Sequence, residues 1–153
     1  MIRTVILDSG PLGLSTNPKK LPETIQITQW TVAMMAAGHK LVVLAIADYE
    51  VRRELKRAGK LRGIALLDAW NRARHDRYLA LTDQALSLAP SLWAHARNAG
   101  TPTADPKELD GDVLIAAQAL SLGLSTSQFI IATVNVGHLA QFAPADIWQN
   151  ITP

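Results

Sequence analysis

The sequence contains no cysteine, which excludes disulfide bridges and thiolate metal ligands. It also lacks an apolar run long enough for a membrane span or for the core of a secretory signal. Neither sign of charge is in large excess, because the formal net charge is only +2. With 153 residues, 48% of them hydrophobic, the chain is expected to form a single domain (residues 1–153) in the reducing cytoplasm, with no membrane partner.

The chain is organised around a short apolar run, Thr4 to Leu7, that stops at Asp8. Four consecutive β-compatible residues without polar alternation predict a strand buried on both faces, and turn-forming residues follow directly. Asp8 is therefore expected at the carboxyl edge of a parallel strand, where open α/β sheets bind ligands. The alternative is that Asp8 only caps the next helix.

Apolar runs alternate with helical stripes along the rest of the chain, which predicts an α/β fold. Further strands are predicted over residues 41–46, 78–81 and 128–133, with a marginal one over 143–148. Helices are predicted over residues 21–38, 47–58, 61–76, 82–98 and 113–122, with a broken helix or loop over 11–20, a kink or restart at Pro90, and a loop over 101–111.

Acidic residues gather where two of these helices begin. Glu50 lies near the start of the helix after the second strand, one turn before Glu54, and Glu108, Asp110 and Asp112 crowd the start of the helix over 113–122. Together with the first-strand aspartate, such carboxylates suit Mg²⁺, which prefers oxygen ligands and keeps several waters. Without a cation they would repel one another and raise at least one pKa.

Each of these acids also has a purely structural interpretation. Either aspartate at the start of the 113–122 helix could be a cap, worth about 0.5–2 kcal/mol. Asp48 fits a helix cap better than a ligand, because it follows directly on the second strand. Glu54 could support the site or form an ion pair with Arg57 or Arg53.

The basic residues are unevenly placed, since nine of the fifteen fall between positions 52 and 77. They are Arg52, Arg53, Lys56, Arg57, Lys60, Arg62, Arg72, Arg74 and Arg77. Such a basic stripe can attract a polyanion. A solvated helical face with a few ion pairs explains it equally well.

The remaining large and titratable side chains carry weaker signals. The four histidines are scattered without ligand spacing, which disfavours a zinc site: His39, His75, His95 and His138. Four large apolar side chains could form either the core or a dimer interface: Trp30, Met34, Met35 and Trp148.

Four motifs, in this order, resemble those of the PIN-domain ribonucleases, whose small bacterial members include the VapC-type toxins. They are Val-Ile-Leu-Asp8-Ser, Ala-Asp-Tyr-Glu50-Val-Arg-Arg-Glu-Leu, Gly-Asp112-Val-Leu-Ile-Ala-Ala-Gln-Ala and Ile-Ala-Thr133-Val-Asn135. The resemblance implies a three-layer α/β/α sandwich with a central parallel sheet of four to five strands in the order 3-2-1-4-5. It also implies an acidic pocket that holds Mg²⁺ or Mn²⁺ and cleaves RNA.

Residue by residue, Asp8, Glu50 and Asp112 match the three acids of the family. Asn135 stands where a fourth acid is often found, and Thr133 matches a hydroxyl that the family places beside the site. A second metal position would therefore depend on Asn135 and on Asp110, two residues before Asp112.

The resemblance also implies partners. The substrate is expected to be RNA. From the basic stripe, Arg52, Arg53 and Arg57 are expected to contact its backbone. A homodimer and an antitoxin protein that fills the groove near the acids are expected as well.

Two other enzyme classes lack their key residues here. A haloacid-dehalogenase-type phosphatase needs a second acid two residues after the first, and position 10 is glycine. No glycine-rich phosphate loop is present either. The remaining alternative is a PIN-like domain without turnover that binds RNA or a protein, for which Asn135 is the main argument.

Overall fold

Five short parallel strands form the centre of the computed structural model, which describes residues 1–102, 105 and 110–153. They are β1 (Thr4–Leu7), β2 (Lys40–Leu44), β3 (Tyr78–Leu79), β4 (Phe129–Thr133) and β5 (Ala145–Ile147). Their order is β3-β2-β1-β4-β5, and every pair is parallel. The predicted sheet order is confirmed.

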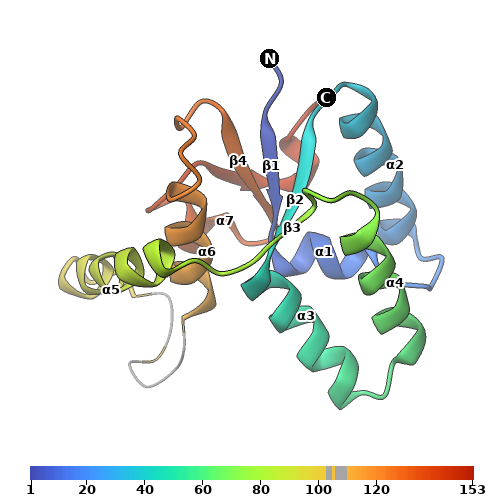
Figure 1. Ribbon diagram of the computed structural model, residues 1–153, viewed down its shortest axis with the longest axis horizontal. Coiled ribbons are helices and arrows are strands. Elements are labelled where there is room, and N and C mark those ends of the chain that lie inside the picture. The colour runs from blue at the N-terminus through green and yellow to red at the C-terminus, as the bar shows by residue number, and fades with distance from the viewer. Residues whose placement is uncertain (103–104, 106–109) are drawn as a thin grey trace.

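Helices flank this sheet and complete the predicted three-layer arrangement (Figure 1). They are α1 (Ser9–Ser15), α2 (Pro22–Ala36), α3 (Ala45–Arg57), α4 (Leu61–Arg72), α5 (Asp83–Asn98), α6 (Gly111–Leu120) and α7 (Val136–Leu139), followed by a 3₁₀ turn, Trp148–Asn150. Within the described part of the chain, no helix has the length and apolar character to span a membrane.

The central strand β1 explains the unbroken apolar run that opens the chain. Val5, Ile6 and Leu7 are fully buried, because β1 lies between β2 and β4 and has helices over both faces. Its register pairs Leu7 with Val43 of β2 and Ala132 of β4. The residues that follow β1 and β4 therefore emerge together at the carboxyl edge of the sheet.

The second strand is shorter than predicted, since Ala45 and Ile46 already belong to α3. Asp48 consequently lies within the helix, and the prediction that it caps a helix is wrong. It is buried and accepts hydrogen bonds from Arg52 Nε (2.8 Å), Arg52 Nη2 (3.0 Å) and Asn71 Nδ2 (2.7 Å). Asp48 thus ties α3 to α4.

Several other boundaries also differ from the prediction. Helix α4 ends at Arg72, earlier than predicted, and α5 runs through Pro90 as one helix. The one-turn helix α7 was not predicted. Glu108 lies outside the described residues.

The large apolar side chains proposed for a dimer interface belong mainly to the core. Met34 and Trp148 are buried, and Trp30 packs edge-to-face on Trp148 with ring centroids 5.6 Å apart. The indole of Trp30 donates to the carbonyl of Ile151 at 2.7 Å. Of the four, only Met35 is exposed, so a homodimer would need other residues.

Candidate active site

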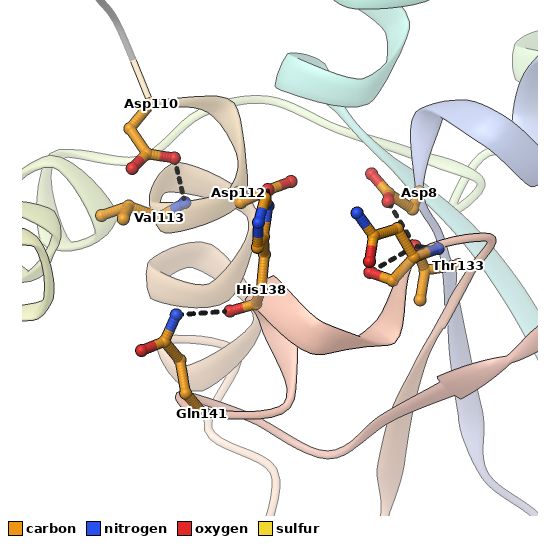
Figure 2. Close-up of polar contacts among 8 residues, drawn as sticks. Asp8, Asp110, Asp112, Val113, Thr133, His138 and Gln141 are labelled. Atoms are coloured by element: carbon orange, nitrogen blue, oxygen red, sulfur yellow. Dashed lines mark hydrogen bonds and ion pairs between the residues drawn. The ribbon is translucent and has the colours of Figure 1, made fainter. Parts of the chain in front are cut away.

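Asp8 stands at the carboxyl end of β1 and has both carboxylate oxygens engaged. Oδ1 accepts from the backbone amide of Ser9 at 2.8 Å, and Oδ2 accepts from the hydroxyl of Thr133 at 2.7 Å (Figure 2). Asp8 therefore does cap α1, as the structural alternative held, but it also faces the end of β4. Its side chain is largely buried, and burial raises the pKa of this carboxyl above its usual value.

Glu50 reaches the same edge from the second turn of α3. Its carboxylate lies against Gly111, at the start of α6: a Cβ on that glycine would stand 2.7 Å from Oε1. This oxygen is buried and has no hydrogen-bond partner among the described residues. A lone-pair acceptor in this state needs a proton or a cation.

Asp112 comes from the first turn of α6, which places it beside Glu50. Its Oδ2 lies 3.0 Å from Nδ1 of His138 on α7 (Figure 2). Asp110 behaves differently: its Oδ1 accepts from the backbone amide of Val113 at 3.2 Å, so it is the cap of α6 that the structural alternative described. This bond directs the carboxylate of Asp110 toward its own helix.

The end of β4 supplies the last two predicted residues. Thr133 is fully buried, and its hydroxyl donates to Asp8 and accepts from the backbone amide of Asn135 at 3.1 Å. Asn135 precedes α7 and brings a neutral amide to this edge. The structure thus places the predicted residues of β1, α3, α6 and β4 at one edge of the sheet.

The three acids influence one another electrostatically. The pKa of Glu50 is raised to about 7, first by burial and then by the negative charges of Asp8 and Asp112, while Arg53 opposes the shift. The pKa of Asp112 is also raised, by burial and by Asp8, against the lowering effect of its hydrogen bond to His138. Among the described residues, the raised pKa values of Glu50 and Asp112 show that burial and the neighbouring carboxylates outweigh the opposing effects of Arg53 and His138.

These features fit a hard divalent cation. The donors are carboxylate oxygens, and Oε1 of Glu50 is a buried acceptor without a hydrogen-bond partner in the part of the chain that the structure describes. Within the described residues, no group of three or more His, Asp or Glu side chains is arranged so that it could hold a metal ion by itself. Mg²⁺ does not require such a set, because it keeps several waters and commonly takes substrate phosphate as a ligand.

A groove of about 800 Å³ leads away from Glu50 between α1, α3 and α4. Its floor is mostly apolar, with Gly13, Val51 and Leu55 among the lining residues. Cations line it as well: Lys19, Arg53, Lys60 and Arg62. The groove therefore begins at Glu50 and is lined by both apolar side chains and cations.

The basic stripe predicted from the sequence is divided in the folded chain. Arg52 binds Asp48 and also Asp68, at 2.8 Å, and therefore acts as a link between α3 and α4. Arg57 pairs with Glu54 at 2.9 Å, which is one of the alternatives given for that glutamate.

The later residues of the stripe are also engaged within the fold. Arg77 is buried, with its guanidinium 4.5 Å from the ring centre of Trp70, and Arg74 pairs with Asp76 at 3.4 Å. Arg53 remains exposed beside Glu50, 5.5 Å from the ring centre of Tyr49.

Two residues of the site escaped the sequence analysis. His138 has no ligand spacing with any other histidine, and its contact with Asp112 depends on the unpredicted helix α7. Gly111 has no side chain, and the sequence does not show that the carboxylate of Glu50 uses the space where a Cβ would stand. The one available signal was position, since Gly111 precedes a predicted acid and His138 follows a predicted strand end.

The sheet order and the acids at its carboxyl edge define a VapC-like PIN fold. Solved structures share this fold. They include FitAcB from Neisseria gonorrhoeae (TM-score 0.68, 15% identity, covering 97% of this chain and 100% of that one). VapBC2 from Rickettsia felis, solved on a DNA fragment from its promoter, matches with a TM-score of 0.69 and 14% identity over 97% of this chain and 99% of that one.

A further structure, FitAB bound to an IR36 DNA fragment, matches with a TM-score of 0.63 and 14% identity, covering 98% of this chain and 99% of that one. No protein-family description and no curated protein matches the sequence. At these identities the structural similarity establishes the fold.

Proposed function

We propose that this protein is a metal-dependent endoribonuclease and the toxin of a toxin–antitoxin pair. The observation that carries the proposal is the buried, partnerless Oε1 of Glu50, whose pKa is raised by the neighbouring charges of Asp8 and Asp112. The structural neighbours, which are toxin–antitoxin complexes, support the same proposal.

Asp8, Glu50 and Asp112 would hold Mg²⁺ or Mn²⁺, with Asp110 fixing the start of α6. The bound ion supplies a polarised water and neutralises charge that develops on the phosphate during hydrolysis. Thr133 orients Asp8 through the 2.7 Å hydrogen bond to Oδ2. Asn135 lies next to Thr133, where it can donate to a substrate oxygen.

Arg53 would bind the RNA backbone beside the acids, because it is exposed and lines the groove that begins at Glu50. Arg57 would contribute more weakly, since its charge is shared with Glu54. Arg52 is left out of this role, because its guanidinium is committed to Asp48 and Asp68.

The groove also suits an antitoxin segment. Its apolar floor can bury side chains, and its end at Glu50 can accept a cation from the partner, which would neutralise the acids and block metal binding. Co-expression with a candidate antitoxin, followed by co-purification, tests this partner. Loss of the complex on Val51→Asp, at the floor of the groove, is the expected result.

The second candidate is a domain of the same fold that binds RNA or protein without cleaving it. It rests on Asn135, which brings an amide where a fourth carboxylate would strengthen a metal site. Incubating the purified protein with RNA and Mn²⁺ separates the two functions. The nuclease shortens the RNA and loses this activity in Asp8→Asn, whereas the binding domain leaves the RNA intact.

A further inference from the structure

His138 holds one specific oxygen of the metal site. Its Nδ1 lies 3.0 Å from Oδ2 of Asp112 (Figure 2), and when Asp112 is ionised, as a metal ligand is, Nδ1 is the donor because a carboxylate only accepts hydrogen bonds. The imidazole is about half exposed, so the contact does not result from tight packing around the ring. It fixes one oxygen of Asp112 and leaves the other for an ion.

The position of His138 is set by its backbone. Helix α7 turns directly after Asn135, and the neighbouring Leu139 is fully buried, which anchors the turn in the core. The carbonyl of His138 also accepts from Nε2 of Gln141 at 3.0 Å (Figure 2). The ring is therefore presented to α6 by an anchored turn.

The carboxylate oxygens of the site come from β1, α3 and α6. The two oxygens of Asp8 and Oδ2 of Asp112 each have one hydrogen-bond contact and keep acceptor capacity for an ion, and Oε1 of Glu50 is buried without a hydrogen-bond partner among the described residues. Two-ion sites place their ions about 3.5–4 Å apart and need further acceptor oxygens to do so. On the α7 side this chain offers the amide of Asn135 and the N–H of His138.

We propose that the site binds one divalent cation and that His138 is a positioning residue, which orients Asp112 toward that ion and occupies the place where a second ion would need a carboxylate. This inference rests on the proposed metal-dependent function. It assigns His138 a role through Asp112, without contact to the reacting phosphate.

Titrating the purified full-length protein with Mn²⁺ in a calorimeter, without RNA, tests the inference through stoichiometry. The wild type is expected to bind one ion, and His138→Asp, which adds a carboxylate beside Asp112, is expected to bind two. His75→Asp is the matched control: it adds the same charge on an exposed loop before β3, at the opposite edge of the sheet, and should still bind one ion.

The same titration measures the positioning effect. His138→Ala should weaken Mn²⁺ binding about tenfold, as loss of a residue that orients a ligand typically does, and His138→Gln should recover part of the affinity by restoring a donor. Two ions in the wild type, one ion in His138→Asp, or unchanged affinity in His138→Ala would overturn the inference while leaving the proposed nuclease intact. No binding by the wild type would overturn both.

Discussion

The carboxylate of Glu50 occupies the space that a side chain at Gly111 would need, with Oε1 2.7 Å from the position of the missing Cβ. Glu50 belongs to α3 and Gly111 to the first turn of α6, so this contact places Glu50 against the residue that directly precedes Asp112. The absence of a side chain at position 111 therefore decides how closely Glu50 approaches Asp112.

Gly111→Ala is expected to push the Glu50 carboxylate aside and to weaken Mn²⁺ binding at least tenfold, because a displaced ligand is felt strongly at a metal site. The fold should survive, since the backbone at Gly111 has no positive φ and alanine suits a helix. Calorimetry gives the affinity, and thermal unfolding checks the fold. Gly13→Ala is the control, because its Cβ would meet only Val51 Cγ2, at 3.9 Å. Equal Mn²⁺ affinity in Gly111→Ala and Gly13→Ala would show that the contact between Glu50 and Gly111 does not position the metal ligand.

The stability of the metal-free protein should depend on the protonation of Glu50. Its pKa is about 7 in the folded protein against 4.5 for the free side chain, so the folded state binds more protons between these values than the unfolded state. The free energy of unfolding should therefore fall as the pH rises from about 4.5 to 7.

Urea unfolding across this pH range in the presence of EDTA measures the effect. Glu50→Gln, which cannot ionise, should flatten the fall, and Glu54→Gln, an exposed glutamate one turn away, should leave it unchanged. A profile that is identical in the wild type and in Glu50→Gln would show that Glu50 does not carry the raised pKa.

Thr133→Val should remove the hydroxyl that donates to Asp8 while keeping the shape of the fully buried side chain. Leaving a buried carboxylate oxygen without its partner costs about 1–3 kcal/mol, and the pKa of Asp8 should rise further. Urea unfolding gives the loss of stability. Thr133→Ser keeps the hydroxyl and loses only the methyl group, so it measures the packing contribution separately. A Val variant as stable as the wild type would show that the hydrogen bond to Asp8 does not stabilise the fold.

The two neighbouring arginines of α3 should separate RNA binding from stability. Arg53→Gln should weaken RNA binding and reduce the slope of log affinity against log salt by about 0.7, the value for one phosphate contact on a single strand. Arg52→Gln should instead lower the free energy of unfolding, because it leaves the buried Asp48 without its charged partner. Fluorescence anisotropy with RNA in EDTA and urea unfolding measure the two effects. A reversed pattern would contradict the assignment of the two arginines.

The main strands could be predicted from the sequence because each is a continuous apolar run that ends at a polar or turn-forming residue, whereas their order in the sheet was implied by the resemblance to PIN domains. The run before Asp8 had to be central, since only a strand with neighbours and helices on all sides buries every side chain. The end of β2 was harder to place. Ala45 and Ile46 are apolar, so their side chains would be equally suitable at the end of a strand or at the start of a helix, and in the structure they open α3, which brings Asp48 to Asn71 of α4.

The candidate site was predictable where it follows directly from strand ends and helix starts. The contacts of Glu50 with Gly111 and of Asp112 with His138 were not, because each depends on how helices distant in sequence pack against one another. The basic stripe shows the same limit. The clustering of Lys and Arg in the sequence predicted one continuous basic surface. The ion pairs of Arg52 with Asp68 and of Lys40 with Asp76 divide these charges, and they form only in the folded chain.

Cleavage of RNA by the purified protein in Mn²⁺, compared between the wild type and Asp8→Asn, tests the central claim most directly. The wild type should cleave members of a broad RNA panel, EDTA should stop the reaction, and Asp8→Asn should lose nearly all activity while remaining folded by circular dichroism. Intact RNA across the panel, or equal cleavage by Asp8→Asn, would contradict the account and leave a non-catalytic binding domain in its place.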